Sequence, residues 1–392
     1  MKERFCRFVV GVTLTLQLFV FMTSAAKSEE QTSDIVNKQL QLLENDFNKG
    51  SSSVFLQMLD LDAILDTALT GLDIKPEFKS GFRQAINNQK AAIGQKFIAQ
   101  ITPGGSAKII RSRTDRGTSR GLIRMDLVAG GYGFMDLYLS VSGNKVVITD
   151  WYDYGFGQRY SDSLRQIVVM AAPNPSLIGR MFDVVTSQDK VIDDILAIMK
   201  LAKEKNYNKI QMEYTKLAAR HKKIRIFMIM MVQVAGASEN DEFYKKVLDD
   251  LATFHGNDPK LTFLLLDHFY YAGKYEKCLD MLDKFIKEIG IKDDALLSLK
   301  ANILIEGGNY DKGISLAKQI ITKSPDFDFA YWVVLNGFVQ AKNYKSAAMT
   351  GRELETRFGY VLDKETLGAE PQYKNFINSK EFARWMANKV KK

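Results

Sequence analysis

The phrase GNYDKG at residues 308–313 returns thirty-four positions later as KNYKSA at residues 342–347. An earlier copy, GKYEKC, occupies residues 273–278, and a weaker copy, EFYKKV, occupies residues 242–247. The tyrosines of the four phrases are separated by 31, 35 and 34 residues. Self-similarity at a fixed period of this length is typical of a helical solenoid. The phrase therefore predicts repeated pairs of helices over the C-terminal half of the chain.

Each predicted unit carries further marks of two packed helices. Apolar residues recur at helical spacing over residues 297–304 and again over residues 314–321. Prolines follow the units because proline cannot continue the hydrogen-bond ladder of a helix. Small residues stand three positions after the marker tyrosines, where two helices must approach closely: Cys278, Gly313 and Ala347.

The turn, the Asn-Tyr or Lys-Tyr pair, the small residue and the closing proline together resemble the tetratricopeptide repeat over residues 228–361. The family's tryptophan in the first helix is missing from its usual place, where Leu297 and Tyr331 stand instead. The resemblance implies an all-α helical-hairpin solenoid with a concave protein-binding surface and no chemistry of its own. An ordinary helical bundle is the alternative.

In the resembled family, the first helix of each unit lines the concave groove. Counting from the marker tyrosines, the resemblance implies these groove residues: Phe263, Asp267, Tyr270, Ser298, Asn302, Ile305, Trp332, Asn336 and Val339. The paired amides Asn302 and Asn336 are expected to hydrogen-bond an extended peptide, and Trp332 is expected to be its apolar anchor. Alternatively, a C-terminal helix over residues 379–390 covers this surface with Phe382 and Trp385, and residues 362–392 are expected to be capping helices.

The first 26 residues have the order of a secretory signal peptide. Three basic residues precede an uncharged, mostly apolar run at residues 8–22, and SAA at residues 24–26 offers a cleavage site. An uncleaved anchor is the alternative, because residues 8–26 form an uncharged run of nineteen. Cleavage leaves Cys278 as the one cysteine and excludes an intramolecular disulfide. An exported protein without disulfides indicates a bacterial periplasmic or envelope location.

The charge balance gives no case for a nucleic-acid partner. The chain has a net charge of +8, and loss of the signal, with three basic residues and one acidic residue, leaves +6. This excess is modest and spread along the chain. Membrane contact is expected only if the signal is kept.

Residues 30–165 are predicted to form an α+β domain. Helical periodicity covers residues 35–47, 55–69 and 76–101, after which the period changes to two. Four strands are predicted at residues 107–114, 119–128, 132–141 and 145–154. Their connections are short enough only for an antiparallel meander. Helices followed by such a sheet resemble, in layout, the cystatin-like fold shared with nuclear transport factors.

One face of the predicted sheet is rich in arginine and aromatic residues. An anionic ligand or an acidic partner would suit such a face. A face covered by another element, with arginines lying over aromatic rings, is the alternative. The residues placed there by alternation are Arg111, Arg113, Arg120, Arg124, Tyr138 and Trp151.

The middle of the chain is predicted to be helical. Pro173 and Pro175 mark the expected domain boundary, so the solenoid is assigned to residues 176–361. Helices are expected at residues 161–170, 177–185, 191–203 and 209–219. The methionine-rich run at residues 224–234 is too short to span a bilayer and is predicted to be a buried helix.

No stretch carries a recognised catalytic motif. The sequence contains no CxxC, no HExxH and no phosphate-binding glycine loop, and its three histidines stand far apart. We therefore expect neither catalytic residues nor a metal or cofactor. The sequence predicts an exported scaffold that binds another protein or peptide through the solenoid groove. The alternative is a periplasmic binding protein that holds a small apolar or anionic ligand in the α+β domain.

Overall fold

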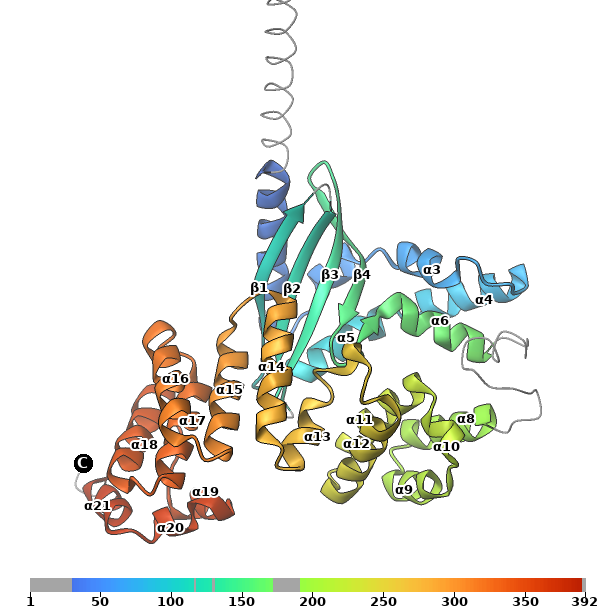
Figure 1. Ribbon diagram of the computed structural model, residues 1–392. Helices are drawn as coiled ribbons and strands as arrows, with labels where there is room; N and C mark the ends of the chain where they lie inside the picture. Colours follow the sequence, from blue (N-terminus) through green and yellow to red (C-terminus); the bar gives the residue numbers. More distant parts are fainter. Residues whose placement is uncertain (1–29, 116–117, 129–130, 172–190, 390–392) are drawn as a thin grey trace, which may run out of the picture. The chain divides into compact units, whose positions relative to one another are not determined.

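The computed structural model describes residues 30–115, 118–128, 131–171 and 191–389 (Figure 1). The chain divides into two compact units between Ala237 and Ser238. The predicted signal, the boundary at residues 173–175 and the helix at residues 177–185 lie outside the described residues. Within the described residues, no helix is long and apolar enough to cross a membrane.

The first unit is built on an antiparallel meander, as predicted. Its strands pair in chain order: β1 (Ser106–Asp115), β2 (Thr118–Asp126), β3 (Tyr132–Ser142), β4 (Lys145–Asp153) and β5 (Gln158–Arg159). The two-residue strand β5 was not predicted, because two residues are too few for an alternating pattern. The assignment to the cystatin-like fold stays a prediction.

Helices lie on one face of the sheet. Residues 30–48 form the first of them, followed by α2 (Ser53–Met58), α3 (Leu61–Leu69), α4 (Pro76–Asn87), α5 (Lys90–Ile101) and α6 (Tyr160–Ala171). Two predicted helices are each divided. At the first division, Asp60 accepts a hydrogen bond from Ala63 N and its own backbone N–H donates to Ile148 O of β4. The N-cap therefore starts α3 anew.

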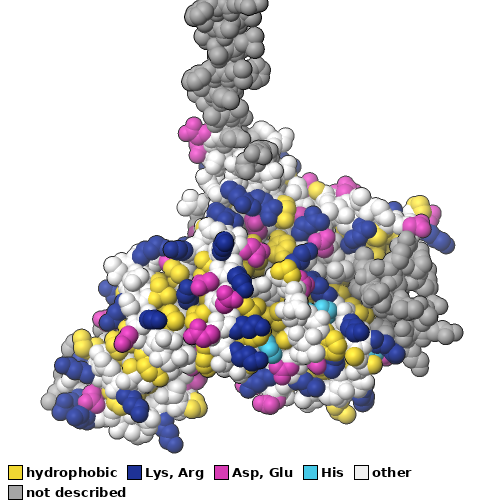
Figure 2. All heavy atoms as spheres, viewed as in Figure 1, with side chains coloured by type: hydrophobic (Ala, Val, Ile, Leu, Met, Phe, Trp, Pro, Cys, Tyr) yellow, Lys and Arg dark blue, Asp and Glu magenta, His cyan; other side chains and the backbone are white. Residues whose placement is uncertain are grey.

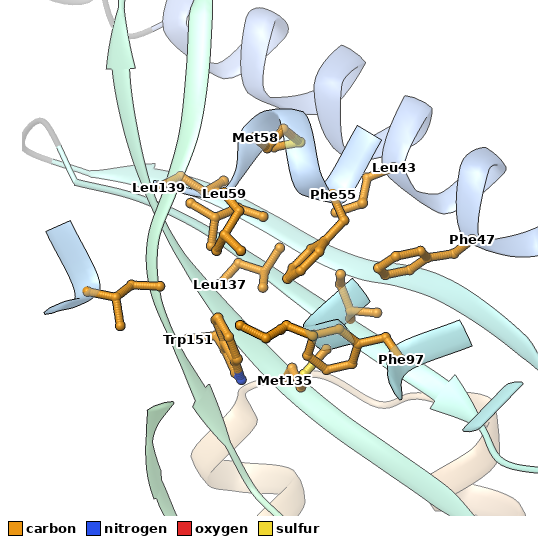
Figure 3. Close-up of a cluster of buried hydrophobic side chains, with 14 of the residues drawn as sticks. Leu43, Phe47, Phe55, Met58, Leu59, Phe97, Met135, Leu137, Leu139 and Trp151 are labelled. Carbon is orange, nitrogen blue, oxygen red and sulfur yellow. The ribbon is translucent and has the colours of Figure 1, made fainter. Parts of the chain in front are cut away.

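The space between these helices and the sheet is filled by aromatic and aliphatic side chains (Figure 3). Phe55, Phe97 and Trp151 meet edge to face, with ring centroids 5.0 to 6.1 Å apart. Phe47 lies 5.9 Å from Phe55. From the sheet, Met135, Leu137 and Leu139 complete the cluster, as the alternation predicted.

The helices that close the first unit are α8 (Val191–Lys203), α9 (Tyr207–Lys216), α10 (Ala219–Lys222) and α11 (Arg225–Gly236). Helix α11 is buried along most of its length, as predicted for the methionine-rich run. Arg225 donates to Phe156 O, Gly157 O and Gln158 Oε1, so α11 is tied to the turn between β4 and β5. His221 is buried between Ala218 O at 3.1 Å and the Asp194 carboxylate at 3.0 Å, which ties α10 to α8.

The second unit consists of stacked helical pairs. It begins with α12 (Asp241–His255), η1 (Pro259–Leu261) and α13 (Leu266–Tyr271). The repeating helices follow: α14 (Tyr275–Ile289), α15 (Asp294–Glu306), α16 (Tyr310–Lys323), α17 (Asp328–Gln340) and α18 (Tyr344–Phe358). Helix α15 packs on α16 and on α17, and α17 packs on α18, so consecutive pairs share one core (Figure 1). The predicted solenoid is therefore confirmed for these pairs.

The repeated phrase has a direct structural meaning. Tyr244 lies inside α12, but each of the other three marker tyrosines is the first residue of a second helix, α14, α16 or α18. The turn before it contains a residue with positive φ, either Gly273, Gly308 or Lys342. A Cβ added at Gly313 would lie 2.6 Å from Ala301 O, so this small residue lets α16 approach α15.

The C-terminal segment packs against the last helical pair. It comprises α19 (Lys364–Gly368), η2 (Pro371–Tyr373), α20 (Lys374–Ile377) and α21 (Lys380–Lys389). Phe382 and Trp385 of α21 are buried in a cluster with residues of α17 and α18. Helix α21 packs on α18, whereas η2 lies against α17.

Candidate functional site: the face of the first helices

Side chains one helical turn apart form a stripe along each first helix of the second unit. Residues four apart lie on the same side of a helix, so α17 presents Asp328, Trp332, Asn336 and Gln340 together. Asn302 and Glu306 hold the matching positions on α15, and Asp267 and Tyr271 hold them on α13. We call these side chains, with Tyr270, the first-helix face.

Three predicted groove residues are not exposed. Ser298 and Ile305 are 0% exposed, and Val339 is 5% exposed. Ile305 lies between two glycines, since a Cβ at Gly313 or Gly337 would come within 2.6 to 2.9 Å of its side chain. The close approach of α15, α16 and α17 therefore buries positions that a count along the chain placed in the groove. Phe263 precedes α13 and is half-buried, with its ring stacked on Phe285 at 4.7 Å.

Hydrogen bonds across the first-helix face join successive helices. Tyr244 Oη of α12 donates to Asp267 Oδ2 at 2.7 Å. Gln340 Nε2 donates to Glu306 Oε1 at 2.7 Å, and the Asn302 amide lies within hydrogen-bonding reach of the Tyr270 hydroxyl. At the far end, Tyr373 of η2 donates to Asn336 Oδ1. Both predicted amides thus contact neighbouring helices within the second unit.

Aromatic rings lie between these polar contacts. Tyr271 is 49% exposed, and its ring is 6.1 Å from those of both Tyr244 and Tyr270. At the other end, the half-buried indole of Trp332 meets the exposed ring of Tyr360 edge to face at 5.2 Å. The face therefore offers accessible aromatic surface at both ends.

The carboxylates influence the tyrosines around them. Burial and the charge of Glu306 raise the pKa of Tyr270 to about 12. Burial, then the charges of Asp267 and Asp241, raise the pKa of Tyr271. The Asp267 carboxylate is exposed to solvent, yet desolvation by its surroundings raises its pKa against the opposing Tyr244 hydrogen bond.

The arginines of the sheet have partners within the first unit. Arg120 donates to Asp136 Oδ2 at 2.8 Å, and its guanidinium carbon lies 3.4 Å above the centre of the Tyr138 ring. Arg124 pairs with Asp126 at 2.7 Å. Arg113 is exposed and 4.0 Å from Asp136, and Arg111 is half-buried. Arginines over aromatic rings match the alternative interpretation of this face.

Trp151 was assigned to the wrong face of the sheet. It is 3% exposed and packs in the core beside Phe97 (Figure 3). Its ring is stacked on that of Tyr160, with centroids 4.1 Å apart. The register explains the error: Tyr138 pairs with Asp150, but Leu139 pairs with Ile148, so one residue of β4 is extra. Such a bulge reverses the alternation.

The side chains that could bind a metal or act as a nucleophile have surroundings typical of structural residues. In the described part of the chain, no three His, Cys, Asp or Glu side chains are grouped as metal ligands. Cys278 is buried, and desolvation raises the pKa of its thiol to about 11, which leaves it protonated at neutral pH. Lysines and arginines are scattered over the viewed surface among acidic residues, not gathered in one patch (Figure 2).

No family model and no curated protein matches the chain. Among solved structures, it is similar to PilW, described as a widely conserved type IV pilus biogenesis factor. That match has a TM-score of 0.35 and 9% identity, and covers 52% of this chain and 93% of PilW. A MamA mutant matches with a TM-score of 0.29 and 12% identity, over 43% of this chain and 96% of that one. The stacked helical pairs of the second unit resemble tetratricopeptide repeats, as the thirty-four-residue period predicted.

Proposed function

We propose that this protein binds another protein through the first-helix face of its second unit. The observation that carries the proposal is the accessible aromatic surface at both ends of that face, at Tyr271 and at the Trp332–Tyr360 pair. Exposed rings on a rigid scaffold are favoured at protein interfaces, because they contribute large contact area at low entropic cost. The hydrogen bonds between successive helices support this role by holding the rings in place before a partner arrives.

The small-ligand alternative for the first unit receives less support. The space between helices and sheet is occupied by the rings of Phe55, Phe97 and Trp151 in direct contact. On the other face, Arg120 and Arg124 already pair with carboxylates of the sheet. Neither the apolar nor the anionic version of that alternative has a prepared site at these residues.

We also propose that the protein is exported and acts in a bacterial envelope. The support is in the sequence: the basic start, the apolar run of residues 8–22 and the small residues at 24–26. The intact mass of native protein tests the proposal. A chain beginning near Lys27 is expected, and retention of the first 26 residues would instead indicate an anchor.

Photo-crosslinking in cells that make the protein tests the binding face. A photoreactive phenylalanine analogue replaces Tyr271 or Val361, which is 67% exposed beside Tyr360, and in a control chain it replaces Met349. Met349 is a matched control because it is 56% exposed but lies on the second helix α18. The same partner is expected at Tyr271 and Val361 and not at Met349. Crosslinks confined to Met349 would place the interface elsewhere.

A further inference from the structure

Three carboxylates of the second unit share an unusual kind of partner. Asp267 accepts from the Tyr244 hydroxyl, Glu306 from the Gln340 amide and Asp328 from the Tyr360 hydroxyl, at 2.5 to 2.7 Å. All three donors are neutral. Among residues 238–389, no lysine or arginine forms an ion pair with any of the three.

Three other carboxylates of the same unit are each paired with a lysine. Asp280 pairs with Lys284 at 2.7 Å, Asp283 pairs with Lys300, and Asp294 pairs with Lys323 at 2.9 Å. Asp294 holds on α15 the position that Asp328 holds on α17, so even matching positions differ in whether a lysine pairs with them. Negative charge is therefore left without a basic partner at Asp267, Glu306 and Asp328.

The aromatic rings beside these carboxylates add a second reason to expect a cation. Asp267 acts electrostatically on Tyr271, and Glu306 acts on Tyr270. The Lys245 ammonium of α12 already lies 5.5 Å from the centre of the Tyr271 ring. Cations are attracted to the faces of such rings, so this ring accepts an ammonium group from within the chain itself.

We propose that the first-helix face recognises a basic segment of its protein partner, in which lysine or arginine side chains alternate with apolar ones. The proposal rests on the proposed function and adds the chemistry of the partner. Asp267, Glu306 and Asp328 supply charge complementarity along the face. Tyr271 and Trp332 supply aromatic surface for the aliphatic parts of the lysine or arginine side chains and for the apolar side chains of the segment.

The test separates the effect of the three side-chain charges from the effect of side-chain shape. In the face variant, Asp267→Asn, Glu306→Gln and Asp328→Asn remove three charges but keep an oxygen that accepts the existing hydrogen bonds. In the control variant, Asp280→Asn, Asp283→Asn and Glu353→Gln make the same change in net charge on α14 and α18. Equal melting temperatures for the face variant and the unchanged chain establish that the fold is kept.

A displayed library of short random peptides is selected against the full chain and both variants. Lysine and arginine are expected to be enriched by the unchanged chain and by the control variant, but not by the face variant. The selected basic peptides should bind the face variant at least about tenfold more weakly. If both variants lose the same amount of affinity for these peptides, the peptides are attracted to net charge in general, and the proposal is overturned.

Failure of this inference is distinguishable from failure of the proposed function. The selected peptides could lack basic residues and bind the face variant but not the Tyr271→Ala chain. That result would overturn the inference of a basic segment and retain the proposed binding face. Selected peptides unaffected by both changes would overturn both proposals. Enrichment of acidic peptides would also contradict the inference.

Discussion

Gln340 donates a hydrogen bond of 2.7 Å to Glu306, and the two residues are thirty-four positions apart in the chain. They hold the same position in successive repeats, at the last turn of α17 and of α15. The bond therefore joins two successive repeats directly. Tyr373 and Asn336 extend the same arrangement into the C-terminal cap.

The first prediction concerns this bond. Gln340→Ala is expected to lower the free energy of unfolding of the second unit by about 1 kcal/mol, the usual net contribution of such a hydrogen bond. Urea denaturation checks the value. In a double-mutant cycle with Glu306→Ala, the two losses should be less than additive, whereas full additivity would mean that the bond contributes nothing.

The second prediction concerns the close contact at Gly313. Gly313→Ala is expected to destabilise the second unit by about 1–3 kcal/mol, because the new methyl group meets the fixed backbone oxygen Ala301 O. Gly81→Ala is the control, since Gly81 lies within α4 with no atom near an added Cβ. That change should stabilise the first unit by about 1 kcal/mol. Thermal melting that shows equal effects would refute the packing argument.

The third prediction concerns the cap. A Cβ at Gly351 of α18 would lie 2.3 Å from Trp385, which is buried. Gly351→Ala should therefore increase hydrogen exchange in α21, as the helix is displaced from α18. The effect should shrink when Trp385→Leu has already reduced the side chain. Unchanged exchange in α21 would show that the cap is held elsewhere.

The fourth prediction concerns pH. Burial raises the pKa of Asp153 to about 6 from an ordinary value of 3.8, against hydrogen bonds from Gly155 N and Phe156 N. Between these values the folded chain keeps a proton that the unfolded chain has released, so this group's contribution to stability falls as pH rises. Asp153→Asn should remove that fall and raise the melting temperature of the first unit at pH 7. If the melting temperatures of the unchanged chain and of the Asp153→Asn chain change in parallel from about pH 4 to about pH 7, the prediction is wrong.

The parts of the fold that depend on local sequence were predictable. The repeat phrase locates three second helices to the residue, because a cap, a turn residue and a tyrosine recur together. The meander was predictable because short turns leave only antiparallel pairing. Asp60 was misassigned to the interior of one long helix, although its side chain favours an N-cap.

The parts that depend on packing between elements were not predictable. No local signal marks the extra residue in β4 that turns Trp151 into the core. A count along the chain placed Ser298 and Ile305 in the groove, but the spacing of α15, α16 and α17 buries them. Tyr271 and Glu306 were missed, although each lies one helical turn beyond a predicted groove residue, Asp267 and Asn302 respectively.

The most direct test of the account is the affinity of the crosslinked partner for the purified full chain. Titration calorimetry compares the unchanged protein with Tyr271→Ala and with the control Met349→Ala. The account predicts that Tyr271→Ala weakens binding about thirtyfold, as expected for loss of a hot spot of about 2 kcal/mol. Met349→Ala should leave the affinity unchanged. If both variants bind as tightly as the unchanged protein while their melting temperatures stay equal, the first-helix face is not the binding surface.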